Sequence, residues 1–183
     1  MNNINKVLIE IAEKSILEAL GKGKKLNKEH YLRQYPQLQE KRATFVTLNK
    51  NKKLRGCIGS LIPHLSLIDD LIHNAKAAAF DDPRFRAVDY NEFKNLEIEI
   101  SLLSYPKKIE YTDINDLKSK VRPYIDGVIL KYSIYRATFL PQVWEQLPEF
   151  DIFFKYLCEK SGMNADCLKN HPNIEVYQVE KIT

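Results

Sequence analysis

This chain of 183 residues is 44% apolar and 28% charged, a composition that supports a packed core and excludes an intrinsically disordered protein. Its 28 basic and 24 acidic residues leave a net charge of +4, which favours an ordinary solvated surface over a dedicated nucleic-acid-binding face. No stretch approaches the roughly eighteen apolar residues that span a bilayer, and the N-terminus lacks a secretory signal, so we expect a cytoplasmic protein without a membrane span.

The first third of the chain is predicted to contain a helix followed by a β-hairpin. Apolar residues recur at helical spacing over 4–19, whereas 22–39 is polar and predicts a loop with a short helical turn. From residue 43 the apolar period changes to two, which predicts strands at 43–49 and 54–62. The polar residues between these strands make an antiparallel hairpin the natural connection.

The hairpin is followed by a second long helix and another strand. Ser66, with Asp69 three residues later, is typical of a capping box, and the helix that it begins should end before the Asp-Pro pair at 82–83. A short helix is predicted at 90–94, and the alternating segment 96–104 predicts a strand.

The second half of the chain is predicted to alternate in the same irregular way. Its expected elements are a short helix capped by Thr112 or Asp113, a hairpin of strands at 127–133 and 135–141, a helix at 150–161 ended by Gly162, and a final strand at 174–182. Hairpins, rather than regular βαβ units, favour an α+β fold with a mostly antiparallel sheet flanked by helices. We expect one domain over residues 1–183, with two lobes.

The three cysteines, Cys57, Cys158 and Cys167, are odd in number and include no C-x-x-C pair. This usage predicts free thiols in a reducing compartment. Cys158 is expected on the apolar face of its helix, in the protein core. No pattern of His, Cys, Asp and Glu has the spacing of metal ligands, so no metal site is predicted, and nothing in the sequence identifies a cofactor.

The segment LRGCIG at 54–59 is the main candidate site. Glycine weakens a strand, so Gly56 and Gly59 indicate either amides left open to a ligand or the close approach of another group. Arg55 would favour the thiolate of Cys57, as a nucleophile requires. The alternative is a buried cysteine whose neighbouring glycines admit a helix, and the residue types alone favour this second interpretation. His64, seven residues after Cys57, is the candidate for its base.

Two other clusters are candidate parts of a site. In FDDPRF at 80–85, Asp82 could act as acid or base and Arg84 could hold a carboxylate or phosphate, although the same residues also suit a simple helix exit. In ATFLPQVWEQLP at 137–148, Gln142 and Trp144 place polar groups beside aromatic surface, as a pocket wall would, although Pro141 at a helix start explains part of the pattern.

Taken in order, these segments resemble the AMMECR family, the family of AmmeMemoRadiSam system protein A. The resemblance covers roughly residues 5 to 182, and the matching segments are ATFVTL, LRGCIGSLIP, AAFDDPRF, LEIEISLLS, DGVIL, ATFLPQVWEQLP and LCEKSGM. It implies an α+β fold with a larger antiparallel-sheet lobe, a smaller lobe and a cleft between them. It also implies a pathway shared with a Memo-type protein and a radical SAM enzyme, but no settled reaction. Near 167–168 the family would have a tryptophan, where this chain has Cys167-Leu168.

The leading hypothesis is an enzyme or enzyme component that acts through a cleft around LRGCIG. In it, Cys57 is the reactive thiol, Arg55 and Arg84 hold an anionic or carbonyl group, and the amides near Gly56 and Gly59 stabilise that group. The remaining predicted lining residues are Asp82 and Gln142. The second hypothesis is a non-catalytic module that binds a protein or RNA partner through the same surface; the G-x-x-G spacing resembles an RNA-clamping loop, but it lies in a predicted strand. A third makes LRGCIG only a packing device.

Overall fold

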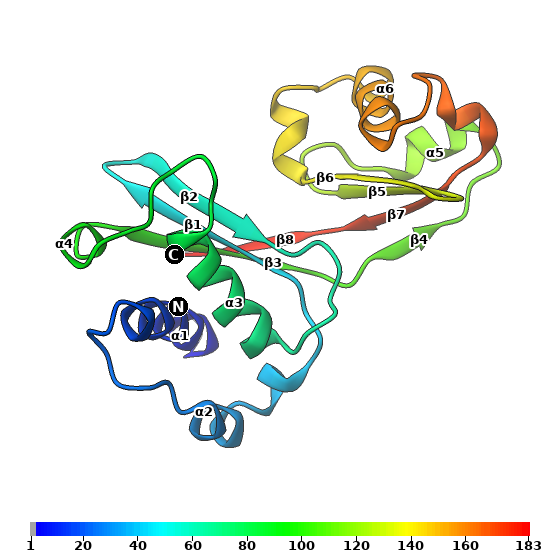
Figure 1. The fold of residues 1–183 in the computed structure, drawn as a ribbon. Helices are drawn as coiled ribbons and strands as arrows, with labels where there is room; N and C mark the ends of the chain where they lie inside the picture. The colour runs from blue at the N-terminus through cyan, green and yellow to red at the C-terminus, as the bar shows by residue number, and fades with distance from the viewer. Residues whose placement is uncertain (1–2) are drawn as a thin grey trace. The chain divides into compact units, whose positions relative to one another are not determined.

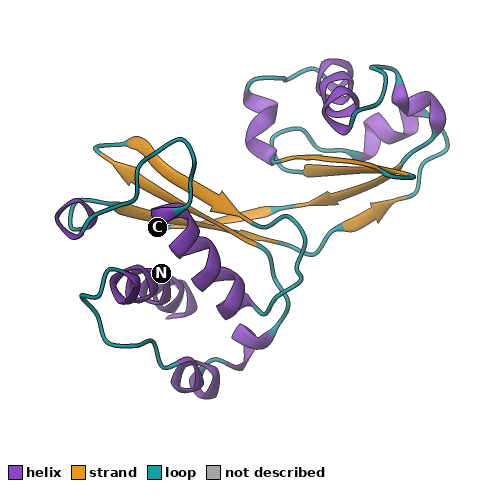
Figure 2. Cartoon of the chain, viewed as in Figure 1, coloured by secondary structure: helices purple, strands orange, loops and turns teal. Residues whose placement is uncertain are grey.

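The computed structural model describes residues 3–183, whose strands form two four-stranded sheets (Figure 1). The chain divides into a first unit, which runs to Leu103 and takes in Glu180–Thr183, and a second unit, Ser104–Val179. Helices cover one face of the sheet in each unit (Figure 2). The predicted α+β class with antiparallel sheets is confirmed.

The first unit contains the hairpin and both long helices that the sequence predicts. Its elements are α1 (Asn3–Ala19), α2 (Lys28–Gln34), η1 (Pro36–Gln39), β1 (Thr44–Lys50), β2 (Lys53–Gly59), α3 (Leu67–Phe80), α4 (Tyr90–Phe93), β3 (Glu97–Leu103) and β8 (Val179–Ile182). The side chain of Ser66 accepts a hydrogen bond from the amide of Asp69, so the predicted cap of α3 is confirmed. The segment 22–39, predicted to be mostly loop, is more helical than expected.

The strand order of the first sheet is β2-β1-β3-β8, which leaves β2 at an edge. Successive side chains of a strand point to opposite faces, and Val46, Leu48 and Ile100 belong to the apolar core that the sheet shares with α1 and α3. Thr47 and Cys57 are directly opposite each other in the β1–β2 pair and lie on the other face. The candidate thiol is therefore on the face away from the helices.

The second unit has its own sheet and its own aromatic core. Its elements are β4 (Lys107–Ile109), α5 (Ile114–Lys120), β5 (Gly127–Tyr132), β6 (Tyr135–Phe139), η2 (Pro141–Glu145), α6 (Phe150–Ser161), η3 (Cys167–Asn170) and β7 (Asn173–Tyr177). The sheet order is β4-β7-β5-β6. Gly162 ends α6 at a φ of 88°, as its position predicts.

The single final strand predicted at 174–182 is wrong, because β7 and β8 belong to different sheets. Between them, the amide of Gln178 donates to the side-chain oxygen of Ser104 at 2.9 Å, and the Gln178 carbonyl accepts from the Ser104 amide at 2.9 Å. This local pair replaces a strand ladder at the point where the chain changes sheets. The apolar alternation changes phase at Val176-Tyr177, close to this break, a signal that the prediction of one strand overlooked.

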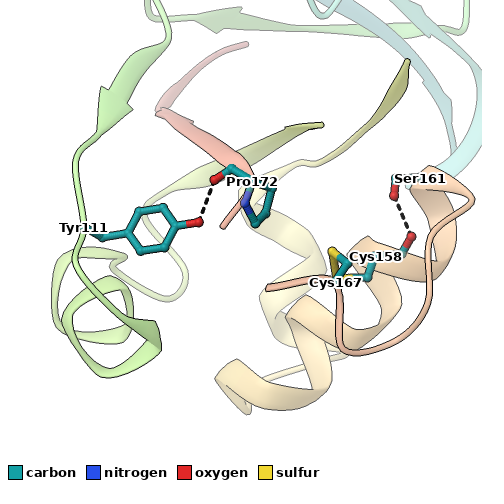
Figure 3. The surroundings of a disulfide bond; sticks show 5 residues. All are labelled: Tyr111, Cys158, Ser161, Cys167 and Pro172. Carbon is teal, nitrogen blue, oxygen red and sulfur yellow. Dashed lines mark hydrogen bonds between the residues drawn. A yellow bond between two sulfur atoms is a disulfide. The ribbon is translucent and has the colours of Figure 1, made fainter. Parts of the chain in front are cut away.

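The expectation of three free thiols is also wrong. Cys158, on α6, forms a disulfide with Cys167, at the start of η3, and the two Cα atoms are 5.7 Å apart (Figure 3). The left-handed turn at Gly162 reverses the chain, which brings residues nine positions apart into bonding range. Cys57 is the free cysteine. The cysteine count therefore gives no argument for a reducing compartment.

Candidate functional site

Cys57 lies half-buried on β2, with its side chain opposite that of Thr47 on β1. The hydroxyl of Thr47 donates a hydrogen bond to the sulfur atom of Cys57 at 3.3 Å. The hairpin register positions this donor, because residues directly opposite in an antiparallel pair share a face of the sheet. Cys57 thus combines a free thiol with a neutral donor aimed at its sulfur.

The backbone of Cys57 is held by side chains from the segment that follows α3. Its amide donates to Oδ2 of Asp82 at 2.9 Å, and its carbonyl accepts from Nη2 of Arg84 at 3.3 Å. An edge strand has unpaired backbone groups that invite another strand. Asp82 and Arg84 therefore supply the hydrogen bonds that a neighbouring strand would make to the backbone amide and carbonyl of Cys57.

Asp82 and Arg84 form a two-pronged ion pair. Arg84 Nη2 and Nε lie 2.7 and 3.0 Å from Oδ2 and Oδ1 of Asp82, and the Arg84 amide lies 3.1 Å from Oδ1. The guanidinium of Arg84 first, and then the Cys57 amide, hold the pKa of the Asp82 carboxyl well below its usual range. The Asp82 side chain is 2% exposed but that of Arg84 is 53% exposed. Arg84 Nη1 has no hydrogen-bond partner within residues 3–183, so it remains available to a ligand.

Arg55 lies in a second, more deeply buried ion pair. Its Nε and Nη2 each lie 2.9 Å from the carboxylate of Glu92, and Nη2 also donates to the carbonyl of Arg86 at 2.8 Å. Arg55 first, then Lys50, lower the pKa of Glu92 to about 2. Both guanidinium groups stand over the ring of Phe85, Arg55 at 5.6 Å from its centroid and Arg84 at 5.5 Å. The charge of Arg55 is thus matched within the protein.

The glycines of LRGCIG lie where other groups approach the backbone closely. A Cβ atom on Gly56 would lie 2.2 Å from the carbonyl oxygen of Ala78, on α3. A Cβ atom on Gly59 would lie 2.2 Å from the ring of Phe45, its partner on β1. These contacts support the interpretation of the glycines as packing positions, one for a helix and one for a ring.

Replacing Gly56 with alanine should lower the free energy of unfolding by about 2–3 kcal/mol, because the obstructing atom belongs to helix backbone and cannot rotate away. Urea unfolding followed by circular dichroism measures the loss. Leu54→Ala, two residues earlier and exposed, is the matched control and should change stability by less than about 0.5 kcal/mol. A Gly56→Ala protein as stable as the parent would mean that α3 does not pack this closely on β2.

The remaining predicted site residues are placed elsewhere. Gln142 lies on η2 in the second unit, and within residues 3–183 its buried Oε1 has no hydrogen-bond partner. His64, the expected base, makes no hydrogen bond to Cys57 in the described part of the chain. Trp144, predicted as a pocket wall, is buried in the core of the second unit.

Sequence reasoning missed Thr47 and Glu92, the direct partners of Cys57 and Arg55. Counting back from the turn would have paired Thr47 with Gly56, because an irregularity between Leu48 and Asn49 shifts the register by one residue; only the structure places Thr47 opposite Cys57. The only local signal for Glu92 is its position in the cap of α4, where the side chain of Asp89 accepts a hydrogen bond from the Glu92 amide. Its bond to Arg55 spans 37 positions and has no local signal.

Residues 3–183 offer neither a metal centre nor a membrane-spanning helix. No group of three or more His, Cys, Asp or Glu side chains is placed to hold a metal ion in this part of the chain. Among the helices described there, none has the length and apolar character needed to cross a membrane.

Comparison with known proteins gives matches along nearly the whole chain. The sequence model of the AMMECR1 family matches residues 9–182. A protein of Methanothermobacter thermautotrophicus is 35% identical over 96% of this chain and 90% of its own length, and one of Sulfurisphaera tokodaii is 38% identical over 96% and 80%. The crystal structure of the uncharacterized protein PH0010 from Pyrococcus horikoshii superimposes with a TM-score of 0.79 at 33% identity, covering 97% of this chain and 89% of that one.

Proposed function

The chain belongs to the AMMECR1 family, and on that premise we propose that it is an enzyme or enzyme component that reacts through the thiol of Cys57. The observation that carries the proposal is the Thr47 hydroxyl, which donates to the Cys57 sulfur at 3.3 Å. A free thiol with a dedicated donor, on a sheet face away from the helices, is more than packing requires.

The chemistry follows from the charges around the sulfur. The thiolate is the nucleophilic form of cysteine, and hydroxyl and guanidinium groups both stabilise negative charge. The pKa of Arg84 is raised, chiefly by its hydrogen bond to Asp82 and to a smaller extent by its proximity to Cys57. With Nη1 free and half of its side chain exposed, Arg84 is the group that would hold an anionic or carbonyl group of a substrate beside the sulfur.

The test is the rate of alkylation of Cys57 by iodoacetamide in the folded protein, followed by mass spectrometry. Thr47→Val removes the donor and should slow alkylation about tenfold, the effect of one hydrogen bond to a charged group. Thr47→Ser restores a hydroxyl and should recover most of the rate. A Cys57 that is unreactive in the parent protein, or a rate equal in all three proteins, would contradict the proposal.

A non-catalytic binding module remains the second candidate, because most residues of the surface are engaged within the protein. Arg55 is paired with Glu92, Asp82 with Arg84, and both glycines serve packing. In this case Cys57→Ser would be silent and Arg84→Glu would weaken capture of a partner. The partners to test are a Memo-type protein and a radical SAM enzyme, which the family resemblance implies. Capture of RNA instead would show a steep loss with salt.

A further inference from the structure

A second hollow, outside the surface around Cys57, lies where the chain passes from β2 into α3. Its volume is about 390 Å³, and its walls come from the loop 60–65 and the first two turns of α3. This volume is within the range of small-ligand pockets. We call it the Asp70 pocket, after the carboxylate in its wall. His64, His73 and Leu65 also line it.

Asp70 is 2% exposed, and its two oxygens differ in their surroundings. Oδ2 accepts three hydrogen bonds, from the Thr44 amide at 2.8 Å, the Thr44 hydroxyl at 2.7 Å and the Asn74 side chain at 2.9 Å. Oδ1 accepts none from residues 3–183, yet it is not among the fully buried atoms that lack a partner. Since Asp70 lines the pocket, Oδ1 is the oxygen that reaches it, and the three bonds to Oδ2 hold it there.

Two histidines from different elements line the same pocket. His64 lies on the loop after β2, and His73 lies on α3, three residues after Asp70. Both side chains are exposed, and neither ring forms a hydrogen bond or an ion pair within residues 3–183. A neutral imidazole has one acceptor nitrogen. The pocket therefore presents three unoccupied acceptors, one oxygen and two nitrogens, beside the apolar side chains of Leu61 and Leu65.

We propose that the Asp70 pocket binds a primary ammonium group carried on an apolar chain. An ammonium group has three N–H donors and no acceptor, so it can bond to the free carboxylate oxygen and to an imidazole nitrogen of the pocket wall. The apolar residues would cover the chain that follows. A metal ion is not proposed here, because no group of three His, Cys, Asp or Glu side chains in the described residues is placed to hold one.

The test is a titration of the whole protein with n-butylammonium, monitored through the ring C–H signals of His64 and His73 by NMR. The pH is kept about two units below the usual pKa of an alkylamine, about 10.4, so that the probe is charged. We expect both histidines to shift together and to saturate at millimolar probe. The neutral isostere n-butanol should produce no saturable shift.

His73→Ala should raise the dissociation constant for n-butylammonium roughly tenfold, because one hydrogen bond to a charged group is lost. His73 is exposed, so the substitution should leave the fold intact. His30→Ala, on α2 and outside the pocket, is the matched control and should leave it unchanged. A second probe, Nα-acetyl-lysine methylamide, keeps the ε-ammonium group of lysine. Comparing it with n-butylammonium distinguishes a lysine side chain from a free amine as the natural ligand. Equal binding of n-butanol, no saturable shift, or tight binding of zinc in place of the amine would each overturn the proposal.

Discussion

Replacing Glu92 with alanine should lower the free energy of unfolding by about 3–5 kcal/mol, because it leaves the guanidinium of Arg55 buried without its counter-charge. The pair is well desolvated: the side chains of Arg55 and Glu92 are 11% and 8% exposed. Nη1 of Arg55 already has no partner within residues 3–183, so Glu92 and one carbonyl supply all of its hydrogen bonds there. Little else is available to replace Glu92.

Urea unfolding monitored by circular dichroism measures this loss, with Glu97→Ala as the matched control on an exposed glutamate nearby. The double variant Arg55→Leu with Glu92→Leu removes both charges and should recover most of the stability, because an apolar pair avoids the desolvation cost. A loss below about 1 kcal/mol in Glu92→Ala would place the pair in the class of surface ion pairs and contradict this account.

The same pair predicts how stability depends on pH. The folded protein holds the pKa of Glu92 at about 2, below the ordinary value of 4.5. A lowered pKa means that the contribution is fully present above the unfolded value and is lost as the pH falls from about 4.5 towards 2. Asp82 shifts in the same direction and contributes to the same acid loss. Glu92→Ala should therefore lose less stability on acidification than the parent protein.

Replacing Trp144 with alanine should destabilise the second unit by about 3–5 kcal/mol, the usual cost of removing a large buried aromatic side chain. Trp144 is fully buried and stacks on Phe153 with ring centroids 3.6 Å apart and an interplanar angle of 4°. Its indole N–H also donates to the carbonyl of Asp126 at 2.9 Å. The substitution therefore removes a stacked ring and leaves a buried carbonyl without its donor.

Trp144→Phe separates these two contributions. It keeps an aromatic ring against Phe153 but loses the donor to Asp126, so it should cost about 1–3 kcal/mol. Thermal unfolding by circular dichroism compares the variants, and the fluorescence of the parent reports on this unit directly because Trp144 is the only tryptophan. Equal costs for Trp144→Ala and Trp144→Phe would mean that the ring itself contributes little.

Local signals in the sequence identified most of the helices and strands. Ser66 and Asp113 cap α3 and α5, and Gly162 ends α6, because a cap depends on groups within three or four residues. The period-two alternation identified β1, β2 and β3 for the same reason. β4 was missed because it has three residues, two of them lysines, which is too short for a period to show.

The candidate site was identified only in part. The resemblance to a known family pointed to LRGCIG and DPRF, and the structure joins these segments through the bonds from Cys57 to Asp82 and Arg84. The sequence did not assign Arg55 to Glu92. Arg55 has the residue type of a ligand-binding group, and only the position of α4 shows that its charge is matched within the protein.

What the sequence by itself determined is thus the set of interactions made within a few residues: caps, alternation, helix ends and the family motif. What only the tertiary structure decided are contacts between distant segments. These are the partner of Arg55, the approach of Ala78 to Gly56, the change of sheet at Gln178 and the Cys158–Cys167 disulfide. The physical reason is that ion pairing, close packing and disulfide formation depend on distances in space, which residue spacing fixes only within a single helix, strand or turn.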